Sequence, residues 1–280
     1  MPKKAITTPV STRRTTRETG RFTRATPGSQ SLERGLQLLR VFRPGVAVLS
    51  NAQLAYRTGL PRPTVSRLTR SLVDAGFLAY DVEQAGYRLT AVCLSLALTF
   101  RSEQRALDLA LPLMRSVAEG QRINVGLALA DQGEMVYLDS VRQSRLGVFR
   151  RIVPGSRIPM ELTSLGHAYL AAMDDIERRA LLERLAADHG RAWPALLLQI
   201  QRAITDVNKL GYCHATWQVG MVAIAAPVTT PEGKVHAVNI SFPLDEDNRM
   251  AQVKTYSALL LELVDKIHTT WRHELVSAAE

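Results

Sequence analysis

Cysteine is scarce in this 280-residue chain, which contains only Cys93 and Cys213, 120 positions apart. That number and spacing exclude a disulfide framework and a cysteine-rich zinc cluster. Long apolar runs are also missing, because none approaches the roughly 20 residues that a transmembrane helix needs. The first residues are basic and rich in threonine, without an apolar stretch, so we expect no secretory signal. These absences predict a soluble, cytoplasmic protein with no membrane partner.

Motifs for catalysis and for phosphate binding are missing as well. The chain has no G-x-S-x-G sequence, no P-loop and no dinucleotide fingerprint. Its six histidines do not have the spacing of metal ligands. Cys213 and His214 are adjacent, but successive residues of a strand point to opposite faces and do not form a catalytic pair. We therefore predict no catalytic residues, no metal ligands and no cofactor.

Positive charge is concentrated in the first third of the chain. Residues 1–28 hold seven basic residues against one acidic, and residues 29–90 hold eight arginines against four acidic residues. The remaining 190 residues are nearly balanced, although the whole chain carries a net charge of +9. Basic residues release counterions when they bind phosphates, so this third predicts double-stranded DNA as a partner. Residues 1–28 are expected to be a disordered tail that either contacts DNA or only aids solubility.

Residues 29–90 have the pattern of a winged helix-turn-helix domain. Apolar residues at helical spacing predict three helices, between Ser31 and Pro44, between Ser50 and Thr58, and between Pro61 and Gly76. A serine suits the helix N-cap, a proline suits the first turn, and a glycine suits the end. Two short strands, over 77–80 and 87–90, complete the pattern as a hairpin.

The third predicted helix carries the residues that we expect to contact DNA. The second helix of a helix-turn-helix enters the major groove with its N-terminal residues on base edges. Val65, Leu68 and Leu72 form a core-facing stripe, which leaves the opposite face free. Arginine can bind guanine with two hydrogen bonds, and serine or threonine can reach a base or a phosphate. The wing tip carries Asp81 and Glu83, so we expect only a minor contact there. The predicted contacts to bases are Arg62, Pro63, Thr64, Ser66 and Arg67, and those to phosphates are Arg70 and Arg88.

Residues 107–280 form a second predicted domain, and a linker helix over 91–106 joins it to the first. Helices are expected at about 107–120, 163–173, 175–189, 194–210 and 249–276, and strands at about 124–130, 134–141, 146–152, 212–216, 221–228 and 234–242. Sequential hairpins flanked by helices indicate an α+β domain with a mainly antiparallel sheet. One helix-turn-helix reads only a few base pairs, so we expect a homodimer, with the apolar segment 91–100 in its interface.

Three stretches of the first domain are SLERGLQLLRVF, SNAQLAYRTGLPRPTVSRLTRSLVDAGFL and GYRLT, and three of the second are PGSRIPMELTSLGHAYLA, GYCHATWQVGMVAIAAPV and AVNISFP. In combination they resemble the IclR family of bacterial transcriptional regulators. The resemblance covers about residues 30–270. It implies a GAF-like α/β effector-binding domain, a dimer or a dimer of dimers, and a palindromic operator.

The resemblance also implies an effector site in the second domain. The matching positions in this chain are Ser164, Leu165, Ala215, Ala223, Asn239 and Ser241. Trp217 stands where many relatives have acidic residues, and it can stack on an aromatic acid or be an ordinary rim or core aromatic. A helix N-terminus after Thr163 offers free N–H groups to a carboxylate. Arg157 can pair with the acid or be a surface ion-pair residue.

The sequence and this resemblance together predict a ligand-responsive transcription regulator that senses a small organic acid, aliphatic or aromatic, and controls catabolic genes. A nonspecific architectural DNA-binding protein is the alternative, and an enzyme that uses the C-terminal domain is favoured less. A footprint discriminates between the first two. Two half-sites about one helical turn apart support the regulator. Smeared protection with a steep salt dependence supports the architectural protein.

Overall fold

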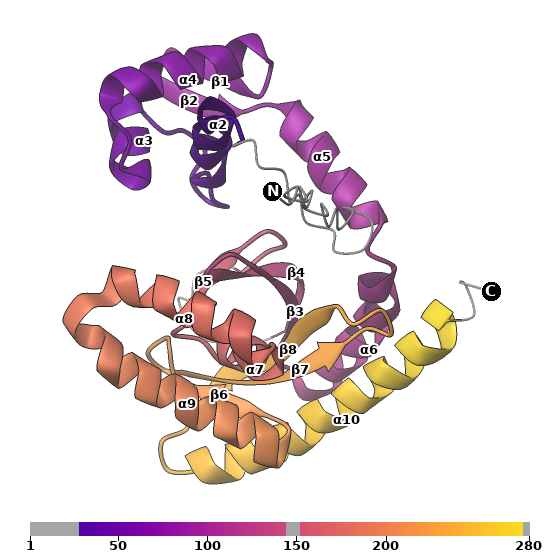
Figure 1. The fold of residues 1–280 in the computed structure, drawn as a ribbon. Helices are drawn as coiled ribbons and strands as arrows, with labels where there is room; N and C mark the ends of the chain where they lie inside the picture. Colours follow the sequence, from indigo (N-terminus) through magenta and orange to yellow (C-terminus); the bar gives the residue numbers. More distant parts are fainter. Residues whose placement is uncertain (1–27, 144–151, 277–280) are drawn as a thin grey trace, which may run out of the picture.

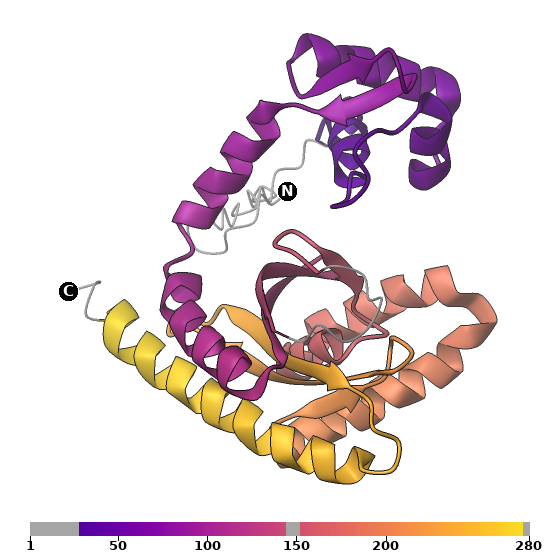
Figure 2. The ribbon, with the colours of Figure 1, turned by 180° about the vertical axis from the view of Figure 1, so that it is seen from behind.

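The computed structural model describes residues 28–143 and 152–276, which form two domains joined by helix α5 (Ala91–Ser102) (Figures 1 and 2). Most of the predicted tail and of the strand predicted over 146–152 lies outside the described residues. No helix in the described part is long and apolar enough to cross a membrane.

The N-terminal domain consists of three helices and a two-stranded hairpin. These are α2 (Gln30–Arg40), α3 (Asn51–Thr58), α4 (Arg62–Asp74), β1 (Leu78–Asp81) and β2 (Gly86–Leu89). Ser50 and Gln53 form a reciprocal capping box at the start of α3. Gly59 has a φ of 70°, a left-handed conformation that ends α3 and lets the chain turn into α4. Leu38, Leu54 and Val65, one from each helix, are fully buried in a common core.

The C-terminal domain is built on one six-stranded antiparallel sheet with the strand order β5-β4-β3-β8-β7-β6. The strands are β3 (Asn124–Asp131), β4 (Glu134–Arg142), β5 (Arg157–Pro159), β6 (Cys213–Ala215), β7 (Met221–Thr229) and β8 (Val235–Pro243). The helices are α6 (Arg105–Gln121), α7 (Ser164–Ala172), α8 (Asp175–His189), α9 (Trp193–Leu210) and α10 (Arg249–Val276), with the short 3-10 turn η1 (Gly190–Ala192) before α9. The predicted fold class, a winged helix-turn-helix domain followed by an α/β domain with an antiparallel sheet, is confirmed.

The two faces of the sheet pack against different helices, as strand β8 shows. Val238, Ile240 and Phe242 point into the larger core, which α6 and α10 cover (Figure 1). Asn239 and Ser241 point to the other face, where α7, α8 and α9 pack. Alternation along the strand therefore places polar side chains on the inner side of the curled sheet, beside the second core.

The connection between the domains differs in detail from the predicted linker. Helix α5 ends at Ser102, and α6 begins at Arg105 after a break at Glu103 and Gln104. The segment predicted as one linker over 91–106 is thus a free-standing helix followed by the start of a packed one. None of the residues of α5 is buried, whereas α6 contributes Leu107 and three further residues to the core.

Candidate functional site

Helix α4 presents its polar face to solvent, on the side of its domain turned away from the C-terminal domain (Figures 1 and 2). Val65 and Leu68 of the predicted core-facing stripe are buried, whereas Leu72 is only half-buried and Thr69, which was not predicted, is buried as well. Thr64 is half-buried, and the other predicted contacts on this helix are exposed, namely Arg62, Pro63, Ser66, Arg67 and Arg70. The guanidinium groups are therefore accessible to a duplex without any movement of the core.

Asn51 at the start of α3 belongs to the same surface, although sequence analysis did not select it. Its Nδ2 atom donates a hydrogen bond of 3.1 Å to the Ser66 hydroxyl. The signal in the sequence that could have pointed to Asn51 is the capping box at Ser50, because it makes Asn51 the first residue of α3. Ser66 can therefore still donate to a base or phosphate, but its oxygen already accepts one hydrogen bond.

The wing offers less to a phosphate than the helix does. Arg88 on β2 lies 3.6 Å from the Asp81 carboxylate, and its side chain is 58% exposed. A phosphate would have to compete with this carboxylate for the guanidinium. The predicted role of Arg88 stays a prediction, and the ion pair with Asp81 agrees with the minor wing contact that the acidic tip suggested.

The C-terminal domain contains two adjoining cavities on the inner face of the sheet, with volumes of about 40 and 70 Å³. Small residues in the strands create this space. Gly126 on β3 is essential here, because a Cβ atom at this position would lie 2.5 Å from Tyr137 Cε1 and 2.7 Å from Asn239 Oδ1. The two cavities share six lining residues: Tyr137, Ile152, Gln218, Met221, Asn239 and Ser241.

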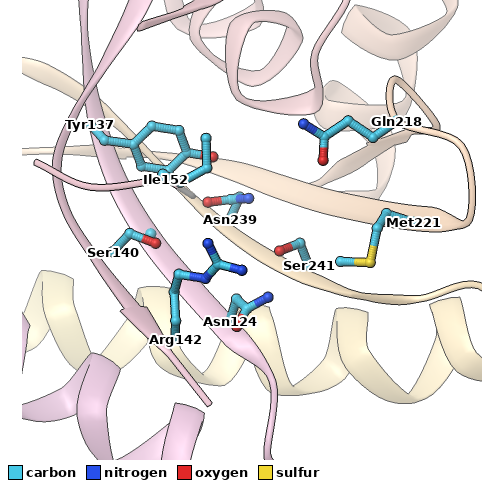
Figure 3. Close-up of a pocket in the computed structure, with 10 residues that line it drawn as sticks. Asn124, Tyr137, Ser140, Arg142, Ile152, Gln218, Met221, Asn239 and Ser241 are labelled. Atoms are coloured by element: carbon cyan, nitrogen blue, oxygen red, sulfur yellow. The ribbon is translucent and has the colours of Figure 1, made fainter. Parts of the chain in front are cut away.

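Polar side chains from three strands converge on the first cavity (Figure 3). Arg142 at the end of β4 extends its guanidinium toward Asn239 on β8. No carboxylate among the described residues pairs with Arg142. The phenol of Tyr137 lies beside the Asn239 amide, yet Asn239 Oδ1 is buried and has no partner with normal hydrogen-bond geometry among these residues. Burial raises the pKa of Tyr137, so its phenol stays neutral.

Five of the seven predicted effector residues line these cavities: Ala215, Trp217, Ala223, Asn239 and Ser241. Ser164 and Leu165 do not line them, and both are buried in the first turn of α7. The side chain of Thr163 already caps that turn, since its Oγ1 atom accepts a hydrogen bond from Gly166 N. The structure thus does not bring the α7 N-terminus to the cavities, and a carboxylate site there stays a prediction.

Sequence analysis missed the residues that β3 and β4 bring to the cavity: Asn124, Gly126, Tyr137, Ser140 and Arg142. It also gave no decision on Arg157, which the structure places in ion pairs with Asp131 and Glu134, away from the cavity lining. The sequence of a short hydrophobic strand does not indicate which of its faces will line a ligand cavity. The register of the strand in the sheet determines that face. A lone arginine at the end of a predicted strand was the only available signal for Arg142.

The exposed basic helix and the separate polar cavity define a class, the helix-turn-helix transcription regulators with a polar cavity in a second domain. Comparison with known families specifies it further. The profile of the IclR helix-turn-helix domain matches residues 31–82, and that of the bacterial transcriptional regulator IclR C-terminal domain matches residues 102–269. The chain belongs to the IclR family, and it is a DNA-binding transcription regulator of that type.

Individual relatives agree with this assignment. The HTH-type transcriptional regulator TsaQ1/TsaQ2 of Comamonas testosteroni is 29% identical over 191 residues, which is 68% of each chain. The crystal structure of an IclR family regulator from Brucella abortus is 33% identical, with a TM-score of 0.75 over 86% of this chain and 92% of that one. An IclR homologue from Microbacterium hydrocarbonoxydans, crystallised with 4-hydroxybenzoate, has the same fold at 22% identity, with a TM-score of 0.67 over 88% of this chain and all of that one.

Proposed function

We propose that this regulator binds a palindromic operator and that a small hydroxylated aromatic acid in the cavity controls the binding. The observation that carries the effector class is the Arg142 guanidinium, which lines the cavity without a carboxylate partner among the described residues. Arginine is suited to bind a carboxylate through two parallel hydrogen bonds. An anionic ligand would therefore complete the charge balance of this site.

Asn239 defines a second requirement for the ligand. Its Oδ1 atom is a buried acceptor without a well-formed hydrogen bond, and such atoms cost free energy unless a donor reaches them. A ligand hydroxyl is a suitable donor. The relative crystallised with 4-hydroxybenzoate supports this combination of a carboxylate and a hydroxyl on one small molecule.

The size and lining of the cavities favour a single ring. Their two volumes are together of the same order as the roughly 150 Å³ that holds one benzene ring. Trp217, Ile158 and Met221 provide apolar surface against which such a ring can pack. Two fused rings with substituents exceed this space.

Calorimetry with a small panel tests the effector class. We expect 4-hydroxybenzoate to bind more tightly than pyruvate and than the neutral 4-hydroxybenzamide. Arg142→Met should weaken 4-hydroxybenzoate binding about tenfold or more, because it removes a charged hydrogen bond, and should leave the amide unaffected. Trp217→Ala should weaken only the aromatic ligands.

Arg202→Met is the matched control, because Arg202 is exposed on α9 and does not line the cavities. Tighter binding of pyruvate than of any aromatic acid would overturn the aromatic class. Unchanged affinity in Arg142→Met would overturn the role of this arginine.

Assembly as a homodimer, or as a dimer of dimers, is part of the same proposal. Helix α5 exposes Leu94, Leu96, Leu98 and Phe100 by half or more of their surface. A free-standing helix with this much exposed apolar surface is typical of a protein–protein interface. Two copies related by a twofold axis would place two recognition helices on one operator, which lies in the cytoplasm with the chromosome.

A footprint on DNA upstream of the genes beside this one tests the operator. We expect two protected half-sites about one helical turn apart, with symmetric sequences. Protection that spreads evenly and falls steeply with salt would instead support a nonspecific architectural protein. The genes under control are expected to encode enzymes that break down the effector.

A further inference from the structure

A cluster of five charged side chains connects the two domains away from the linker helix. Arg40, the last residue of α2, and Arg43 just after it reach across to the tip of the β3–β4 hairpin. The tip carries Asp131 at the end of β3 and Glu134 at the start of β4. Arg157 at the start of β5 flanks the same two carboxylates from within the C-terminal domain.

The geometry of the cluster is close and mutual. Arg40 Nη2 lies 2.6 Å from Asp131 Oδ2, and Arg43 Nη2 lies 3.0 and 2.9 Å from the two Glu134 oxygens. Arg157 donates from Nε to Glu134 at 2.7 Å and forms an ion pair of 2.5 Å with Asp131. Each carboxylate therefore bridges one arginine of its own domain and one arginine of the DNA-binding domain.

The environment of the cluster distinguishes it from ordinary surface ion pairs. Arg157 has only 14% of its side chain exposed, and Arg43 Nη1 is buried without a partner among the described residues. Partial burial alone would raise the pKa of Asp131, but the hydrogen bonds from Arg40 and Arg157 outweigh it and leave the pKa below its usual value. Networks of this kind hold their geometry better than isolated exposed pairs.

The cluster is the main connection between the domains besides α5. In the described chain, no helix or strand of the DNA-binding domain packs extensively against the C-terminal domain. Figures 1 and 2 both show the end of α2 facing the β3–β4 hairpin, with α4 on the opposite side of its domain. The contact thus leaves the recognition helix α4 uncovered.

The same hairpin forms a wall of the cavity. Strand β4 carries Glu134 at its start and Tyr137 and Arg142, both of which line the cavity, further along. The backbone of Tyr137 is hydrogen-bonded on both sides to the segment before β5: its N–H donates to Ser156 O at 2.9 Å, and its carbonyl accepts from Gly155 N at 2.8 Å. One short piece of sheet therefore joins the cavity, the two carboxylates and Arg157.

We propose that Asp131 and Glu134 form an intramolecular docking site for Arg40 and Arg43, which holds the DNA-binding domain in one orientation and ties that orientation to the cavity wall. The docking acts as a restraint that a change at the cavity can tighten or release. It builds on the proposed function only in taking the cavity as the effector site. Both tests below use the protein without ligand, so a failed effector titration leaves their outcome intact.

Energy transfer between two dyes on the full-length chain tests the docking. The labels are placed at Glu83→Cys on the wing and Glu183→Cys on α8, both exposed, in a Cys93→Ser background, with excess unlabelled protein. Cys213 is buried and stays unlabelled. We expect one narrow distribution that broadens toward longer distances when salt rises from about 0.05 to 0.5 M, because salt screens the ion pairs.

Variants on either side of the contact should reproduce the effect of salt. Arg40→Glu with Arg43→Glu should broaden the distribution at low salt and abolish its salt response. Asp131→Asn with Glu134→Gln should do the same from the other domain. The control, Arg34→Glu, reverses an exposed charge on the same helix and should behave like wild type. A wild-type distribution in both double variants would overturn the docking.

Amide hydrogen exchange tests the tie to the cavity wall. Arg40→Glu with Arg43→Glu should increase the exchange of peptides that contain Tyr137 and Gly155 several-fold, because their mutual hydrogen bonds brace the hairpin. Peptides from α9 on the far side of the core, and all peptides of Arg34→Glu, should exchange as in wild type. Unchanged exchange at Tyr137 and Gly155 would show that the docking is not transmitted to the cavity.

Discussion

Arg67 is the single residue on which sequence discrimination by α4 is expected to depend most. It is exposed in the N-terminal half of the helix, next to the Ser66 hydroxyl that Asn51 positions. Arg67→Ala should reduce the preference for operator over random DNA by about 1–3 kcal/mol, the usual value of a two-bond contact to guanine. Competitive gel shifts at fixed salt measure this preference.

Arg70 provides the comparison for that measurement. It is exposed later on the same helix, where a phosphate contact is expected. Arg70→Ala should weaken operator and random DNA alike and reduce the slope of log affinity against log salt by about one. Retained operator preference in Arg67→Ala, or a selective loss in Arg70→Ala, would reverse the two assignments.

His236 makes the stability of the C-terminal domain depend on pH. It is 1% exposed, its ring centre lies 5.2 Å from that of Trp271, and burial lowers its pKa from 6.5 to about 4. Between these values the unfolded chain binds a proton that the folded chain does not, so stability is lost as the pH falls. The loss should reach about 3 kcal/mol between pH 6.5 and 4.

Denaturant unfolding at a series of pH values checks this expectation. His236→Gln should flatten the slope of the unfolding free energy against pH across that window, whatever it does to stability at pH 7. Some slope should remain because burial also lowers the pKa of His167. The same slope in variant and wild type would show that His236 is not the group responsible.

Among the elements, α7 depends on a close approach that only glycine permits. A Cβ atom on Gly166 would lie 2.0 Å from Met160 O and 2.5 Å from Met160 C, both backbone atoms that cannot rotate away. Gly166→Ala should therefore destabilise the C-terminal domain by about 3 kcal/mol, the upper part of the range for overpacking.

Gly120 in α6 is the matched control, because it is exposed and a Cβ atom there meets no atom within 4 Å. Gly120→Ala should stabilise the domain by about 0.5–1 kcal/mol through helix propensity. Thermal unfolding of both variants provides the comparison. If Gly166→Ala unfolds like Gly120→Ala, α7 has room that the structure does not show.

The difference between local and long-range information explains which elements and residues could be predicted. The helix-turn-helix follows from apolar spacing, a serine cap and a terminal glycine, all of which act within a few residues. The cavity depends on pairings across the sheet, where the register of β3 against β4 shifts between Leu127 and Ala128. This irregularity, together with the pairing of Asn124 with Arg142, decides that Arg142 reaches the cavity. No short segment of sequence contains that information.

For the whole molecule, the two domains are connected at two places with different chemistry. Helix α5 joins the domains covalently and exposes a largely apolar surface. The cluster around Asp131 and Glu134 joins them through ion pairs. Salt weakens the second connection, whereas it leaves apolar association intact or strengthens it. A rising salt concentration should therefore release the docking of the two domains while the proposed dimer stays intact.

The apolar surface of α5 leads to a prediction about assembly. Leu94 and Leu98 lie one turn apart on this helix and are 60% and 57% exposed. Glutamates at both positions should dissociate the proposed dimer without unfolding either domain, because neither side chain contributes to a core. Sedimentation velocity at micromolar concentration should show a monomer, and far-ultraviolet circular dichroism should be unchanged.

Ser95→Glu with Thr99→Glu adds the same charge on polar positions of the same helix, and this control should stay dimeric. A dimeric Leu94→Glu, Leu98→Glu protein would show that the copies meet elsewhere, and a monomeric wild type would remove the dimer altogether.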